Sequence, residues 1–99
     1  MRRRITFRQL ETFAAVARLG SFSRAAEAMH LTQPAVSIQL RQLADTVGMP
    51  LFDQTGRELR LTAAGDELLA TVRSLDDVWN RFDSAIDELR GLRRGKLRV

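Results

Sequence analysis

The sequence contains no cysteine and only one histidine, His30, among its 99 residues. The lack of cysteine excludes disulfides, iron–sulfur clusters and cysteine-rich zinc sites, and a single histidine argues against a histidine-ligated metal. No apolar run approaches the roughly 18 residues that suggest a membrane span, and the Arg-rich start lacks the apolar stretch of a signal peptide. We therefore expect a cytoplasmic protein with no membrane contact and no metal or other cofactor.

Motifs typical of catalysis are also lacking. The sequence holds no phosphate-cradling glycine loop, no nucleophile elbow and no cluster of potential metal ligands. An enzyme is therefore not expected, and the function has to be sought in binding.

What the sequence does have is uneven charge. The net charge is +4, but residues 1–31 carry six Arg against two acids, whereas residues 66–90 carry three Arg against seven acids. Residues 91–99 are basic again. A basic face attracts nucleic acid, but it is also the commonest kind of solvated surface. The charge pattern suggests separate surfaces without deciding what they bind.

The first helix is predicted by a capping-box pattern, Thr6 with Gln9 three residues later. It ends at Leu19-Gly20, and its apolar face repeats at helical spacing through Leu10, Phe13, Ala14 and Ala17. A second, short helix is capped by Ser21 or Ser23 and ends near Met29. We expect His30, directly after it, to pack at the helix end.

A third helix follows a brief break. Thr32 is a good N-cap, Pro34 suits the first turn, and Gly48 with Pro50 ends the helix. Its inward stripe is Val36, Leu40, Leu43 and Val47. Two short strands over 51–54 and 59–61 then form a small hairpin.

Thr62 caps a fourth, long helix. From there an apolar heptad pattern runs without interruption through Leu68, Val72, Leu75, Trp79, Phe82, Ile86 and Leu89. An isolated helix cannot bury this stripe, so the pattern favours a partner helix; the alternative is a stripe packed within the chain. Apolar residues at the g positions, Val78 and Ala85, weakly favour an antiparallel pair.

Together these elements predict a mainly α protein: a winged helix-turn-helix with a small β-hairpin wing and a long C-terminal dimerisation helix. The third helix would enter the major groove of DNA, which is wide enough to admit it. Gln can pair with adenine, Ser is adaptable and an exposed Ile can meet a thymine methyl. The candidate contacts on this helix are Gln33, Pro34, Ser37, Ile38 and Arg41.

Further candidates lie outside the third helix. Ser21, Ser23 and Arg24 are at the start of the second helix, where backbone N–H groups bind phosphate readily. Arg57, at the hairpin tip, could enter a minor groove or touch phosphate. Any one of these residues could equally be part of a solvated surface, but the set as a whole favours DNA contact.

Several segments resemble the LysR-type transcriptional regulators. They include Gly20-Ser21-Phe22-Ser23-Arg24-Ala25-Ala26, Leu31-Thr32-Gln33-Pro34-Ala35-Val36-Ser37 and Leu61-Thr62-Ala63-Ala64-Gly65, and the likeness runs in order through residues 5–65. Within that family, residues 31–37 and 91–97 are similar to regulators of Calvin-cycle (RuBisCO) operons. Three positions depart from the family pattern: Ile38 stands where many members carry Arg or Lys, Gln54 replaces a frequent Arg, and Ala44 replaces a common Glu.

The resemblance implies a dimer that binds a dyad-symmetric operator in double-stranded DNA. It also implies DNA contact at the positions that match the family's contact residues, namely Thr32, Gln33, Pro34, Ala35 and Ser37. It divides the chain into a DNA-binding domain over 1–65, a linker helix over 66–90, and a hinge with the start of an effector domain over 91–99. We therefore expect a piece of a longer regulator, for which a tetramer and contact with RNA polymerase stay open. The alternative function is a winged-helix protein-interaction module that does not read DNA.

Overall fold

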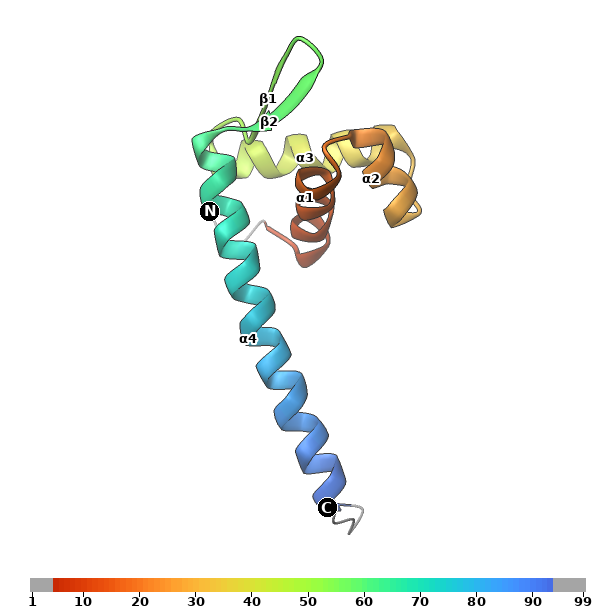
Figure 1. Cartoon of the computed structure of the whole chain (residues 1–99), viewed down its shortest axis with the longest axis vertical. Coiled ribbons are helices and arrows are strands. Elements are labelled where there is room, and N and C mark those ends of the chain that lie inside the picture. Colours follow the sequence, from red (N-terminus) through yellow and green to blue (C-terminus); the bar gives the residue numbers. More distant parts are fainter. Residues whose placement is uncertain (1–4, 94–99) are drawn as a thin grey trace.

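The computed structural model describes residues 5–93. Its elements are, in order, α1 (Phe7–Leu19), α2 (Phe22–Met29), α3 (Gln33–Val47), β1 (Phe52–Thr55), β2 (Glu58–Leu61) and α4 (Ala63–Arg93). Helices α1 to α3 pack into a head, the hairpin projects from it, and α4 runs far beyond it in the other direction (Figure 1). The predicted fold class is confirmed. The Arg run at 2–4 and the strand expected to start at 97–99 lie outside the described residues.

Helix α1 begins and ends as the sequence predicts. The Gln9 backbone N–H donates to Thr6 Oγ1 (3.0 Å), the Thr6 N–H donates to Gln9 Oε1 (3.1 Å), and Gly20 ends the helix in the left-handed region. The buried face is wider than predicted and includes Thr12 and Val16, whereas Ala14 and Ala17 are only half-buried. The reason is that α1 contacts α2, α3 and α4 on different sides.

Helices α2 and α3 are joined by a tight turn. Of the two candidate caps for α2, Ser21 fills the role, because its Oγ accepts the Arg24 N–H (3.1 Å). His30 takes a left-handed conformation (φ 58°) and is exposed, so the expectation that it packs at the helix end was wrong. Its backbone caps α2 instead. Thr32 caps α3 by accepting the Ala35 N–H (3.2 Å).

The hairpin is present as predicted, but its strand bounds and the length of its turn differ from the prediction. Phe52 pairs with Leu61 and Thr55 with Glu58, so the turn contains only two residues, Gly56 and Arg57. Leu51, which was expected in the first strand, precedes it and is buried in the head. At Leu51, burial of the apolar side chain in the core therefore takes precedence over continuation of the strand.

The base of the hairpin is bonded to the start of α4. The Thr62 N–H donates to the Leu51 carbonyl oxygen (3.0 Å), the Thr62 hydroxyl donates to the Pro50 carbonyl oxygen (2.7 Å), and Thr62 Oγ1 accepts the Gly65 N–H (3.0 Å). A Cβ at Gly65 would overlap the Leu51 carbonyl oxygen and would lie 2.8 Å from Leu61 Cδ2. Only glycine fits here, because the helix and the preceding loop lie in direct contact.

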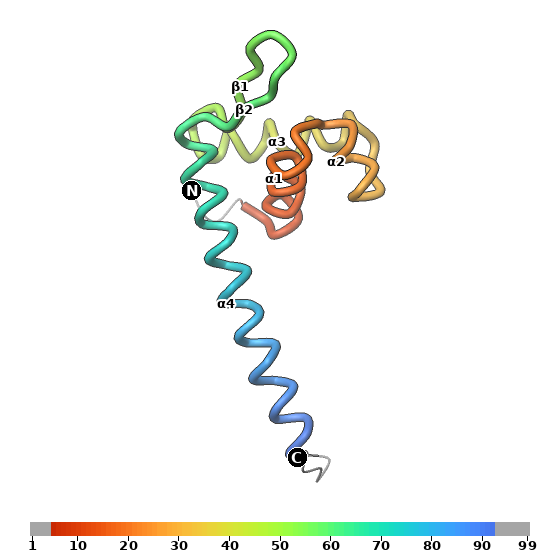
Figure 2. The backbone as a smooth tube through the Cα atoms, in the orientation of Figure 1, coloured from red at the N-terminus to blue at the C-terminus, as the bar shows by residue number. Residues whose placement is uncertain are grey.

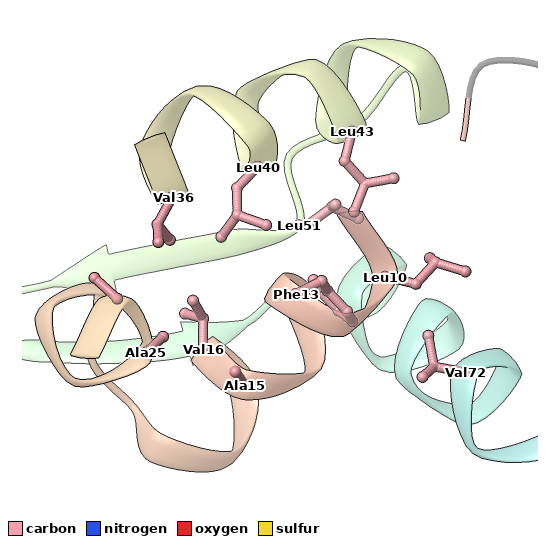
Figure 3. Close-up of a cluster of buried hydrophobic side chains, with 11 residues drawn as sticks. Leu10, Phe13, Ala15, Val16, Ala25, Val36, Leu40, Leu43, Leu51 and Val72 are labelled. Atoms are coloured by element: carbon pink, nitrogen blue, oxygen red, sulfur yellow. The ribbon is translucent and has the colours of Figure 1, made fainter. Parts of the chain in front are cut away.

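Figure 3 shows the core of the head, to which every helix contributes. Phe13 is fully buried, and its ring centre lies 5.3 Å from that of Phe52. Val72 of α4 joins this cluster, and Leu68 packs against it. These two members of the heptad pattern were expected at a dimer interface, but they are packed within the single chain because the first turns of α4 lie beside α1.

Beyond Val72, α4 diverges from the head, and Trp79 still contacts Phe7 of α1. It continues without a break through Gly91 to Arg93, so the expected boundaries after residues 65 and 90 both fall inside one helix. Its large apolar side chains are mostly exposed there, namely Leu75, Val78, Trp79, Phe82, Leu89 and Leu92. None of the helices within residues 5–93 is long and apolar enough to cross a membrane.

Candidate nucleic-acid interface

Helices α2 and α3 form a helix-turn-helix whose two N-terminal turns meet. The turn of three residues, 30–32, brings Ser23 in the first turn of α2 next to Gln33, the first residue of α3. The Ser23 hydroxyl donates to Gln33 Oε1 at 3.0 Å. Neither helix has an acidic residue in its first turn. The partial positive charge of both helix starts is therefore not neutralised locally, which suits contact with phosphate.

The face of α3 turned away from the core is uncovered. Pro34, Ile38 and Arg41 are exposed on it, as predicted from the inward stripe on the opposite side. Ile38 is 51% exposed and places an apolar side chain on this face. Ala35 and Ser37 flank this face and are half-buried. Thr32 and Gln33 complete it at the helix start, where both are exposed.

Three exposed arginines lie on this face or on the elements next to α3. Arg24 lies on α2, Arg41 on α3 and Arg57 in the turn of the hairpin. The ion pairs found within residues 5–93 involve other arginines: Arg60 with Glu58 (3.0 Å) and Arg90 with Asp87 (3.5 Å). The guanidinium groups of Arg24, Arg41 and Arg57 therefore meet no carboxylate in the described part of the chain and are available to phosphates.

Helix α3 and the hairpin lie at the end of the molecule remote from the far end of α4 (Figure 2). A duplex laid along α3 could therefore meet the hairpin without meeting the outer half of α4. The hairpin therefore lies beside α3, at the place expected for the wing of a winged helix-turn-helix.

One polar contact that positions α3 was missed by the sequence analysis. Thr12 is fully buried on α1, and its Oγ1 lies 2.9 Å from the Arg8 carbonyl oxygen and 2.7 Å from Gln39 Oε1 on α3. The contact ties α3 to α1. The apolar periodicity of α1 does not predict this contact, because threonine is a polar residue and does not count among the apolar positions of the buried face.

Metal ligation finds no support in the part of the chain that the structure covers. No group of three or more His, Asp or Glu side chains among residues 5–93 could hold an ion. The candidate interface consists of hydroxyl, amide, guanidinium and apolar groups.

Comparison with known proteins decides the family. The model of the bacterial regulatory helix-turn-helix proteins of the lysR family matches residues 7–66. The chain belongs to the LysR family. This confirms the resemblance seen in the sequence. It also agrees with the expectation of a regulator rather than an enzyme, since the matched relatives are named as transcriptional regulators.

Two curated relatives illustrate the LysR similarity. The chain is 53% identical over 97 residues to a RuBisCO operon transcriptional regulator of Acidithiobacillus ferrooxidans, covering 98% of the chain and 31% of that protein. It is 50% identical over 92 residues to the HTH-type transcriptional regulator CbbR of Rhodospirillum rubrum, covering 93% of the chain and 31% of CbbR. The chain thus spans about a third of the length of these relatives.

Solved LysR-family structures share the fold. The CbnR DNA-binding domain, crystallised in complex with DNA, superposes with a TM-score of 0.78 at 31% identity, covering 87% of this chain and 99% of that one. The BenM DNA-binding domain in its complex with benA site 1 DNA gives a TM-score of 0.81 at 24% identity, covering 87% and 97%, and supports the fold alone.

Proposed function

We propose that this chain is the DNA-binding and dimerisation part of a longer LysR-family transcriptional regulator, and that it binds a dyad-symmetric operator in double-stranded DNA. The observation that carries the proposal is the uncovered outer face of α3 together with Arg24, Arg41 and Arg57, which meet no carboxylate within residues 5–93. In this proposal α3 enters the major groove and Arg57 approaches the neighbouring backbone or minor groove.

The candidate contacts divide into two roles. Gln33, Ser37 and Ile38 lie on the outer face of α3 and are assigned to base edges. Ser21, Arg24 and Arg41 are assigned to phosphates, together with the backbone N–H groups at the start of α2. Pro34 and Ala35 let the start of α3 approach the groove closely, and Thr32 holds that start as its cap.

The controlled process is proposed from the relatives. Proteins named as regulators of the RuBisCO operon are similar to this chain over nearly its whole length. We propose that the longer regulator controls genes of carbon fixation. A footprint on the promoter of such an operon in the source organism, made with the longer protein, would support this.

The outer half of α4 is proposed as the dimer contact. Trp79 is 54% exposed, and its ring centre lies 5.8 Å from that of Phe7 on α1 and 5.4 Å from that of Phe82. The apolar surface is therefore continuous from α4 onto the head. A dyad-symmetric operator has two equivalent half-sites, so we propose that a second copy of the chain covers this apolar surface. In an antiparallel pair of α4 helices, Val78 and Ala85 lie against apolar neighbours.

The remaining assignments concern the longer protein. We propose that residues 1–65 form the DNA-binding domain, that 66–90 form the linker helix, and that an effector domain follows from about 91–99. A tetramer and contact with RNA polymerase are proposed for that longer regulator, to be tested by sedimentation and by a binding assay with purified polymerase.

Selection of duplexes from a random pool by the purified chain tests the main proposal. The expected result is an enriched sequence with dyad symmetry, whose binding weakens steeply as salt increases. Gln33→Ala should relax the preference at one base position in each half-site. Equal affinity for selected and random duplexes would contradict sequence-specific binding and would favour a protein-interaction module.

A further inference from the structure

The contact between Ser23 and Gln33 links the two helices of the helix-turn-helix through side chains. Ser23 Oγ and Gln33 Oε1 are both oxygen atoms and lie 3.0 Å apart. The amide oxygen carries no hydrogen, so the serine must donate. Both residues are exposed, and they come from different helices ten positions apart, so the contact is not part of either helix's own hydrogen bonding.

This bond has a directional consequence for Gln33. With Oε1 held toward α2, the Nε2 group is left to point away from Ser23, and no hydrogen bond from Nε2 is found within residues 5–93. Gln33 then offers two N–H donors. A glutamine that pairs with adenine must also turn its oxygen to the base, to accept from N6 while its nitrogen donates to N7. Oε1 keeps a second lone pair, but the bond to Ser23 fixes the orientation of the amide and so turns Nε2, rather than Oε1, toward the bases. Guanine presents two acceptors, N7 and O6, and thymine presents O4.

Resting on the proposed DNA-binding function, we propose that Ser23 is a positioning residue that sets the base preference of Gln33. It holds the amide so that Gln33 reads an acceptor edge, guanine or thymine, in place of adenine. In this role Ser23 touches no base. The role differs from the phosphate contact that the sequence suggests for Ser23, and the two have different consequences for binding.

A phosphate contact and a positioning contact separate cleanly in a binding experiment. Loss of a phosphate contact weakens binding to every sequence by a similar factor. Loss of a positioning contact changes the preference at one base position and leaves the others unaltered. Arg24→Ala serves as the matched control for the first behaviour, because Arg24 is the exposed neighbour of Ser23 on α2.

The experiment uses the wild-type chain, Ser23→Ala and Ser23→Thr. The base read by Gln33 is located first, as the position whose preference disappears in Gln33→Ala. The affinities for the selected duplex and its three single-base variants at that position are then measured for each protein. Thermal unfolding by circular dichroism verifies that the exposed substitution leaves the fold intact, and Ser23→Thr retains the hydroxyl.

The wild type should prefer guanine or thymine at this position. Ser23→Ala should lower that discrimination about fivefold, the worth of one neutral hydrogen bond, and should raise the relative affinity for adenine. Ser23→Thr should keep the wild-type profile. The inference is overturned if the wild type prefers adenine or cytosine there, or if Ser23→Ala weakens all duplexes equally with an unchanged profile. A wild-type chain that enriches no duplex would instead overturn the proposed function itself.

Discussion

The head and the outer half of α4 place similar aromatic side chains in opposite surroundings. Phe13 is fully buried among residues of its own chain, whereas Trp79 and Phe82 are 54% and 52% exposed. Both regions show the same regular apolar spacing in the sequence. Regular apolar spacing therefore identifies a helix face that will be buried. Whether the chain itself or another molecule buries that face depends on whether an element of the same chain packs against it.

The largest expected effect comes from removing a side chain of the head. Phe13→Ala should lower the free energy of unfolding by about 3–5 kcal/mol, because it leaves a cavity among α1, α3 and β1. Phe82→Ala is the matched control and should change it by less than about 0.5 kcal/mol in a monomeric sample. Urea unfolding at a concentration where sedimentation gives monomers measures both. Equal losses would erase the distinction between the two regions.

The second effect concerns association. Replacing Trp79 and Phe82 together by Glu should raise the dimer dissociation constant at least about 100-fold, because two large apolar side chains lose their burial between copies. Sedimentation velocity across a dilution series measures this.

Arg81→Glu provides a charge-matched control for that experiment. It changes the net charge of the helix by the same amount as the double variant, but Arg81 lies outside the apolar stripe. It should leave the dimer largely intact. A dimer that survives the Trp79 and Phe82 substitutions would mean that this stripe is not the dimer contact.

The third prediction concerns the junction between the two regions. Gly65→Ala should cost about 1–3 kcal/mol of stability, because the new methyl overlaps the Leu51 carbonyl oxygen. Gly91→Ala lies in the same helix with nothing near its Cβ, and it should instead stabilise by about 0.5–1 kcal/mol. The midpoint temperatures of thermal unfolding of the two variants should therefore shift in opposite directions. A shift of the same sign in both would show that the backbone around Leu51 moves to make room for the methyl group.

The smallest effect distinguishes arginines of the two regions. Arg24→Ala should weaken binding to all duplexes by a similar, modest factor, and should reduce the slope of log affinity against log salt by about 1. Arg81→Ala, on α4, should leave that slope unchanged. Fluorescence anisotropy at several salt concentrations measures both. If the two variants gave equal slopes, Arg24 would not be one of the phosphate contacts.

Local features of the fold were predictable because their signals are local. Thr6 with Gln9, Thr32 and Gly48 mark helix ends through bonds or backbone conformations within a few residues. The sequence also predicts the inward stripe of α3, of which Val36, Leu40 and Leu43 are buried. The exposed outer face of α3 follows from this stripe, which is why most of the candidate interface could be identified in advance.

Features that depend on distant parts of the chain could not be predicted in this way. Val72 belongs to the core of the head and not to the exposed heptad stripe. It faces α1 because of the direction in which α4 leaves the hairpin, which the heptad pattern does not determine. The contact of Thr12 with Gln39 spans 27 positions and that of Ser23 with Gln33 joins two helices. Such polar pairs have no periodicity and appear only once the helices are placed.

The junction at Thr62 and Gly65 acts on the geometry of the whole assembly. Helix α4 contains 31 residues, so at 1.5 Å per residue it is about 46 Å long, and a rotation of about 5° at its start moves its far end by about 4 Å. This displacement is close to the rise of one base pair. In a dimer joined through α4, the tight packing at Gly65 would therefore fix the distance between the two heads. That distance determines the spacing between the two half-sites that the dimer can bind.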